Sequence, residues 1–143
     1  MKVLVDADLL LEALMNRSKN GVNTRELLNI DNSGIQLYLT DLGWQKIYAY
    51  TSRFHNDKIN ATVVNILQNK FYICSVDCEV LQTACSLWQL DFESSVELAC
   101  VTKQKLNAIV THKPEDFAAV TNQFQVWSLI DLLHRSHLEV QLT

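Results

Sequence analysis

Apolar and polar positions follow two alternating patterns along the chain. Short apolar runs of strand composition recur, and between them apolar residues return at the three- and four-residue spacing of an amphipathic helix. The predicted strands are residues 2–5, 35–40, 71–76, 108–111 and 124–127. Strands that alternate with helices predict βαβ units. We therefore expect an α/β fold, a three-layer α/β/α sandwich with a mainly parallel sheet of about five strands.

Helical patterns fill the intervals between these strands. They cover residues 9–14, 23–30, 44–50, 59–67, 80–88, 91–100 and 129–133. The chain has 143 residues, of which 48% are hydrophobic and 20% charged, so it can bury one sizeable core. No linker, internal repeat or low-complexity segment interrupts the alternation. We expect a single domain over residues 1–143.

Composition and charge indicate where the protein is located and what it can bind. No apolar run approaches the roughly 18 residues of a membrane-spanning helix, and the first residues predict a strand, not a signal peptide. We therefore expect a cytoplasmic protein without membrane contact. The formal net charge of −4 gives no general attraction to nucleic acid, so RNA binding would need a local basic patch. Arg17, Lys19 and Arg25 are the best candidates for such a patch.

The cysteines show no pairing or zinc-binding pattern. They are Cys74, Cys78, Cys85 and Cys100, and neither a Cys-x-x-Cys motif nor a histidine pair at ligand spacing accompanies them. All four fall within apolar helix or strand patterns, so we expect reduced thiols in the core. The same helical spacing places Trp88, Leu98 and Ala99 in or beside the core.

Acidic residues follow three of the predicted strands. Asp6, Asp41 and Asp116 come after the first, second and fourth strands, and parallel strands bring their carboxyl ends to one edge of the sheet. The helix before the fourth strand can add one more acid there, from Asp91, Glu93 and Glu97. Clustered carboxylates suit Mg²⁺ or Mn²⁺, which can activate water and stabilise the leaving oxygen of a phosphodiester. The simpler interpretation is that these acids cap helices.

Three segments, in this order and spacing, resemble small PIN-domain proteins. They are residues 3–10, residues 90–99 and residues 109–117, and the resemblance extends over nearly the whole chain. The resemblance implies an α/β/α fold, hydrolysis of RNA with Mg²⁺ or Mn²⁺, and the toxin role in a bacterial toxin–antitoxin pair. RNA, an antitoxin-like protein and a second copy of the chain are then the expected partners.

The resemblance also implies a set of site residues. Asp6 falls on the first acid of the family and Asp116 on the aspartate of its last motif, and Asp91 joins them as a catalytic candidate. The candidate metal ligands are Asp6, Asp116, Asp91, Asp41 and Glu97.

The chain departs from the family pattern at three positions. Gln45 stands where the family has a glutamate, and Ser94 stands where it has an aspartate. Lys113 replaces an asparagine or aspartate, and its ammonium would compete with a cation for the same carboxylates. The site is therefore partly degenerate. The alternative to a nuclease is a catalytically inactive PIN-like module that binds nucleic acid or protein.

Other protein classes share single features with the chain. Residues 3–8 resemble the opening motif of haloacid-dehalogenase-like phosphatases, but the later glycine–aspartate motif is missing. Response-regulator receivers have a similar acidic pair, yet here the Lys113–Pro114 pair follows the wrong strand. A Ser-His-Asp hydrolase needs glycines around its nucleophile, and this chain does not have them. The phosphatase is kept as a further alternative.

Overall fold

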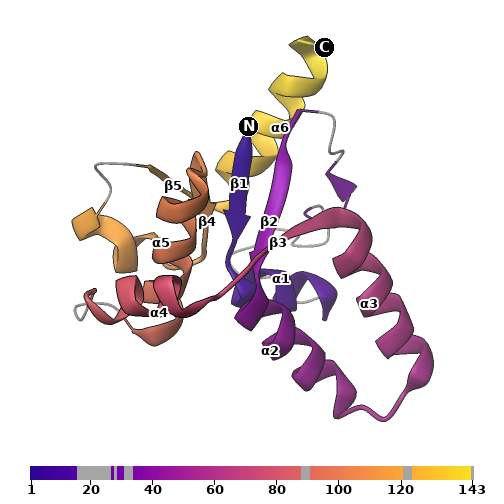
Figure 1. Cartoon of the computed structure of the whole chain (residues 1–143). Helices are drawn as coiled ribbons and strands as arrows, with labels where there is room; N and C mark the ends of the chain where they lie inside the picture. The colour runs from indigo at the N-terminus through magenta and orange to yellow at the C-terminus, as the bar shows by residue number, and fades with distance from the viewer. Residues whose placement is uncertain (16–26, 28, 31–33, 88–90, 121–123, 143) are drawn as a thin grey trace.

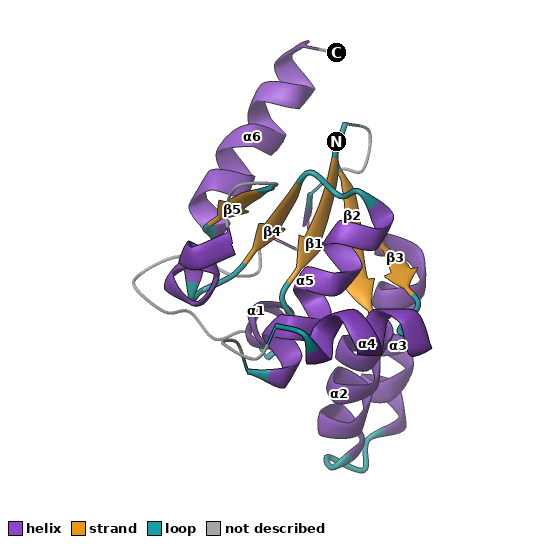
Figure 2. Cartoon of the chain, turned by 60° about the vertical axis from the view of Figure 1, so that its left-hand side comes forward, coloured by secondary structure: helices purple, strands orange, loops and turns teal. Residues whose placement is uncertain are grey.

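A parallel five-stranded sheet forms the centre of the computed structural model, which describes residues 1–15, 27, 29–30, 34–87, 91–120 and 124–142 (Figures 1 and 2). The strands are β1 (Lys2–Val5), β2 (Gln36–Thr40), β3 (Phe71–Cys74), β4 (Ala108–Val110) and β5 (Gln125–Trp127). Their order across the sheet is β3-β2-β1-β4-β5, and every neighbouring pair is parallel. The predicted α/β fold is confirmed.

Helices cover both faces of this sheet. They are α1 (Ala7–Leu14), α2 (Asp41–Ser52), α3 (Asp57–Lys70), α4 (Cys78–Cys85), α5 (Phe92–Gln104) and α6 (Leu129–Leu142), and a 3₁₀ segment, η2, spans Pro114–Val120. Buried residues of α1, α2, α3 and α6 share one core cluster, whereas those of α4, α5 and η2 share the other. Figure 1 shows α4 and α5 on the opposite side of the sheet from α3. The predicted three layers are therefore present.

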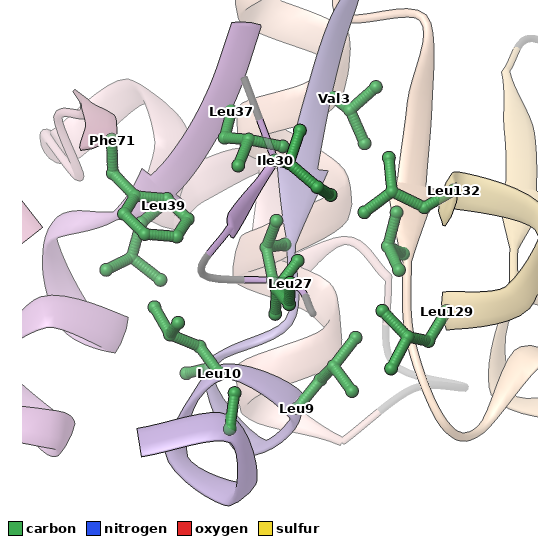
Figure 3. Packing of buried hydrophobic residues seen from close by; sticks show 14 of the residues in the cluster. Val3, Leu9, Leu10, Leu27, Ile30, Leu37, Leu39, Phe71, Leu129 and Leu132 are labelled. Atoms are coloured by element: carbon green, nitrogen blue, oxygen red, sulfur yellow. The ribbon is translucent and has the colours of Figure 1, made fainter. Parts of the chain in front are cut away.

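Alternate residues of the central strands point into the two cores. In β1, Val3 packs into the cluster that contains α1 and α6, where Figure 3 shows it near Leu132, and Val5 belongs to the same cluster. Leu4 packs into the cluster that contains α5. All three side chains are at most 1% exposed. A strand that is buried on both faces needs an uninterrupted apolar run, which explains why residues 3–5 contain no polar position.

The first turn of α2 lies unusually close to β2 and α1. Thr40 is the N-cap of α2, and its hydroxyl accepts a hydrogen bond from the Gly43 N–H at 2.9 Å. A Cβ atom on Gly43 would come within 3.0–3.1 Å of Leu39, Ala7 and Thr40. Glycine at this position therefore lets α2 begin directly beside the turn that follows β1.

Some element boundaries differ from the sequence prediction. The third strand ends at Cys74, two residues before the predicted apolar run does. Helix α2 starts at Asp41 and ends at Ser52, longer at both ends than the predicted 44–50. It starts earlier because Thr40 supplies an N-cap that the apolar spacing does not reveal. The predicted helix 23–30 falls mostly outside the described residues.

The cysteines divide into two groups. Cys74 and Cys100 are buried, but Cys78 and Cys85 are exposed, so the prediction of four core thiols is wrong for the latter two. Helix α4 turns Val80 and Ala84 inward, and the two exposed cysteines lie off this stripe. All four cysteines are free.

The other core predictions and the membrane prediction have clear outcomes where the structure describes the residues. Leu98 and Ala99 are buried in α5 as predicted. Trp88, Arg17, Lys19 and Arg25 lie outside the described residues. Of the described helices, none is long and apolar enough to cross a membrane.

Truncating a central core residue should destabilise the protein strongly. Leu39 of β2 is fully buried, so Leu39→Ala is expected to lower the free energy of unfolding by about 2–5 kcal/mol, through lost apolar burial and a residual cavity. Ile73→Ala on the edge strand β3 is the control, because that side chain is 44% exposed and should cost less than about 1 kcal/mol. Urea denaturation followed by circular dichroism measures both. Equal losses for the two variants would contradict the assigned core.

Candidate functional site

The candidate site lies at the point where the order of the strands across the sheet reverses direction. Strand β1 has β2 on one side and β4 on the other, and crevices in open α/β sheets form at the carboxyl ends of strands at such a point. Asp6 directly follows β1, and Thr111 directly follows β4. The Asp6 N–H donates to the Val110 carbonyl at 2.9 Å, so the hydrogen bonding between β1 and β4 continues as far as Asp6.

Asp6 is held in place through both carboxylate oxygens. Oδ1 accepts the Asp8 N–H at 3.0 Å, which makes Asp6 the N-cap of α1, and Oδ2 accepts the Thr111 hydroxyl at 2.9 Å. Thr111 is 1% exposed and also accepts the Lys113 N–H at 3.1 Å, so its own position is fixed. Burial raises the pKa of Asp6, although the hydrogen bonds from Asp8 and Thr111 oppose the shift.

Glu97 brings a second carboxyl group to Asp6. Its side chain on α5 is 6% exposed, and its carboxyl group is hydrogen-bonded to Asp6. Burial, followed by the charge of Asp6, raises the pKa of Glu97 well above its usual value. Within the described part of the chain, its Oε2 atom has no hydrogen-bond partner. A buried oxygen without a donor is unusual and favours a site that a cation can complete.

A lysine joins two further acids of the same region. The Lys46 ammonium on α2 lies 2.7 Å from Oδ1 of Asp8 and 2.9 and 2.8 Å from the two carboxylate oxygens of Glu93. Burial on its own lowers the pKa of Lys46, but the hydrogen bonds to Asp8 and Glu93 outweigh burial and raise the pKa. The beginnings of α1 and α5 are thus linked through a cation from α2.

Two hollows give access to these groups. One, of about 400 Å³, is lined by Gln45, Lys46, Glu93 and Glu97 together with apolar residues. The other, of about 230 Å³, is lined by Asp6 and Asp8 and by other residues that include His112 and Lys113. Nε2 of His112 lies against Oε2 of Glu12 at this second hollow.

The predicted acids occupy different environments. Asp91 is exposed and caps α5 by accepting the Ser94 N–H at 2.8 Å. Asp41 is the first residue of α2 and accepts a hydrogen bond from the Gln45 amide at 3.4 Å. Asp116 lies in η2, after β4, and is half-buried. Because β1 and β4 are adjacent and parallel, Asp116 and Asp6 follow the same edge of the sheet.

The structure joins only part of the predicted set. Asp6 and Glu97 are in contact, but no group of three or more His, Cys, Asp or Glu side chains among the described residues is placed to hold a metal ion. The roles of Asp116, Asp91 and Asp41 as ligands stay predictions. Sequence reasoning missed Thr111 and Lys46. Nothing in the spacing indicates either contact, since Thr111 is 105 residues from Asp6 and Lys46 is 47 residues from Glu93.

The residues present fit a hard divalent cation. Asp6 and Glu97 supply carboxylate oxygens, which Mg²⁺ and Mn²⁺ prefer, and the buried Glu97 Oε2 lacks a donor among the described residues. Mg²⁺ usually keeps several water ligands and needs only one or two carboxylates from a protein. The pair can therefore hold such an ion, with water as the remaining ligands.

The chain belongs to the PIN domain family, whose sequence pattern it matches over residues 2–113. This membership confirms the resemblance found in the sequence and supports it over the phosphatase and receiver alternatives. No curated protein sequence matches the chain significantly.

Solved structures of toxin–antitoxin proteins share the fold. VapBC2 from Rickettsia felis, bound to a DNA fragment from its promoter, superposes with a TM-score of 0.68 at 8% identity, covering 90% of this chain and 98% of that one. A toxin–antitoxin complex from Klebsiella pneumoniae gives 0.62 at 16% identity, with coverages of 82% and 92%. VapC20 from Mycobacterium tuberculosis, a toxin that cleaves the sarcin–ricin loop, gives 0.58 at 10% identity, with coverages of 75% and 86%.

Replacing the carboxyl group of Glu97 should stabilise the metal-free protein above about pH 4.5. Because the pKa of Glu97 is higher in the folded than in the unfolded chain, the folded state binds more protons and stability falls as pH rises above about 4.5. This loss should be absent in Glu97→Gln. In the wild type it amounts to about 1.4 kcal/mol for each pH unit between the pKa of Glu97 in the unfolded chain and its pKa in the folded chain. Thermal unfolding in chelator from pH 4.5 to 8.5 measures it.

The control is Glu115→Gln, which changes an exposed acid in η2 and should leave the pH profile as in the wild type. A Glu97→Gln profile parallel to that of the wild type would show that Glu97 ionises freely in the folded chain.

Proposed function

We propose that this PIN domain hydrolyses RNA with Mg²⁺ or Mn²⁺ at a partly degenerate site centred on Asp6 and Glu97. The observation that carries the proposal is the contact of the buried Glu97 carboxyl group with the half-buried Asp6 carboxylate at the strand-order reversal, with Glu97 Oε2 lacking a donor among the described residues. Membership of the PIN family and the fold shared with toxins support the same conclusion.

The residues of the chain divide the work at this site. Asp6 is the principal ligand, and its carboxylate is oriented by the Thr111 hydroxyl and the Asp8 N–H. Glu97 is the proposed second ligand, and because burial beside Asp6 raises its pKa, an approaching cation would have to favour its ionised form. A bound Mg²⁺ or Mn²⁺ supplies an activated water and stabilises the leaving oxygen. Asp116, Asp91 and Asp41 are the proposed supplementary acids.

A catalytically inactive binding module is the second candidate. Gln45 and Ser94 stand where the family has acids, and Gln45 lines the same hollow as Glu97. The Lys46 ammonium is bound to two carboxylates next to the pair, where it opposes an incoming cation. If these changes abolish hydrolysis, the fold would serve to bind RNA or a protein.

An antitoxin-like protein is the proposed partner in the cytoplasm. Support comes from the structural neighbours, several of which are complexes of a toxin with its antitoxin. RNA as substrate and a second copy of the chain complete the proposed set of partners.

RNA cleavage tests the proposal directly. Mixed RNAs are incubated with Mn²⁺ and the wild type, Asp6→Asn or Asp57→Asn. The wild type should cleave, and Asp6→Asn should lower the rate at least about a hundredfold, because it weakens the principal ligand. Asp57→Asn changes an exposed acid at the start of α3 and should retain full activity.

A Gln45→Glu/Ser94→Asp double variant distinguishes the two candidates. If the wild type is inactive with every RNA and the double variant cleaves, the inactive module is correct. If neither cleaves or binds metal while the wild type dephosphorylates small phosphate esters, the phosphatase alternative replaces both.

Asp91 can be tested separately, because asparagine caps helices as well as aspartate does. Asp91→Asn should therefore leave the melting temperature unchanged, and if Asp91 is a supplementary ligand it should weaken Mn²⁺ binding severalfold. Asp91→Ala should in addition lower stability by about 1 kcal/mol. Unchanged Mn²⁺ affinity in Asp91→Asn would limit Asp91 to its capping role, which the hydrogen bond to Ser94 already shows.

A further inference from the structure

We propose that Lys46 is a built-in counter-cation that weakens divalent-metal binding at the acidic site. The inference rests on the metal site of the proposed function. It goes further because it proposes that Lys46, which is not one of the metal ligands, controls how tightly the site binds an ion.

The position of Lys46 is defined by three elements. Its ammonium contacts Asp8 on α1 and both carboxylate oxygens of Glu93 on α5, with all three distances at or below 2.9 Å. Lys46 lines the same hollow as Glu93 and Glu97, so the ammonium lies beside the space from which an ion would reach Glu97. Its partners, Asp8 and Glu93, belong to the elements that also carry Asp6 and Glu97.

The acids on both sides of Lys46 form one electrostatic group. The negative charges of Asp6, Glu93 and Asp8 all raise the pKa of Glu97, so these carboxylates act on one another. An ion that binds Asp6 and Glu97 would also be attracted by Asp8 and Glu93. Lys46 cancels part of that attraction, and its hydrogen bonds occupy three carboxylate oxygens that could otherwise serve as ligands.

The size of the effect follows from Coulomb's law. A unit positive charge a few ångströms from a divalent cation, in a water-like dielectric, reduces the binding constant by about tenfold. Lys46 is 38% exposed, so the water-like dielectric is the appropriate one. Removing the charge should therefore tighten binding by about tenfold, and by more if Asp8 or Glu93 then becomes a ligand.

The chain offers a matched control in Lys103. This lysine is also paired with two acids, Asp77 at 2.5 Å and Glu79 at 3.3 Å, with a similar side-chain exposure of 33%. Its partners belong to the beginning of α4, and Lys103 lies in the last turn of α5, so none of the three lines the hollow that contains Lys46 and Glu97. Lys103→Gln therefore removes the same charge and a similar ion pair without touching the proposed site.

Mn²⁺ binding is measured by electron paramagnetic resonance and calorimetry, without RNA, for the wild type, Lys46→Gln, Lys46→Arg and Lys103→Gln. Lys46→Gln should bind Mn²⁺ about tenfold more tightly than the wild type. Lys46→Arg retains the charge and Lys103→Gln retains Lys46, so both should bind like the wild type. Lys46→Met is the substitute if Lys46→Gln does not fold, as judged by thermal unfolding in chelator.

The outcomes separate this inference from the proposed function. Tighter binding in Lys46→Gln alone supports the inference even if no variant cleaves RNA, in which case only the proposed hydrolysis fails. A wild type that cleaves RNA while Lys46→Gln binds Mn²⁺ no more tightly would overturn the inference and leave the proposed function standing. The absence of Mn²⁺ binding in every variant, or equal gains in Lys46→Gln and Lys103→Gln, would also overturn it.

Discussion

Burial of the Glu97 carboxyl group against Asp6 is the interaction on which the acidic site depends. Burial raises the pKa of both groups, and the charge of Asp6 raises the pKa of Glu97 further, whereas the hydrogen bond from Glu97 lowers the pKa of Asp6. Such a contact lowers the stability of the folded chain at neutral pH. A protein retains two carboxyl groups in this arrangement only where the fold holds them firmly, and here the β1–β4 pairing and the packing of α5 do so.

The β1–β4 pairing fixes one of the two partners. Asp6 is bound through its backbone to Val110 and through its side chain to Thr111, and both of these residues lie at the end of β4. Helix α5 fixes the other, because residues 95–101 are buried without interruption. The carboxyl contact therefore joins two rigid elements, which is the usual condition for a site that must hold a fixed geometry.

Lys46 gives this arrangement its particular character. An acidic cluster without a cation would repel itself, and a bound metal ion is the usual remedy in a nuclease. Here a lysine from α2 already pairs with the outer acids, Asp8 and Glu93, while Asp6 and Glu97 are hydrogen-bonded to each other. In this PIN domain one lysine therefore offsets part of the negative charge that α1 and α5 bring to the site.

The sequence by itself determined the fold class and the position of Asp6 at the end of a buried strand. Apolar runs at 3–5 and 108–110 had to be strands buried on both faces, and because these strands are parallel neighbours, Asp6 and Asp116 both follow strand ends at the same edge of the sheet. Local patterns also identified Asp91 as a helix cap, since capping depends only on neighbouring backbone groups.

Only the tertiary structure decided which acids meet. Glu97 faces Asp6 because of the way α5 packs on the sheet, and Lys46 reaches Asp8 and Glu93 because Gly43 allows α2 to begin close to α1. These contacts join residues 38 to 105 positions apart, and neither periodicity nor spacing along a chain carries information about such pairs. Their geometry comes from the packing of whole elements, which the local sequence does not contain.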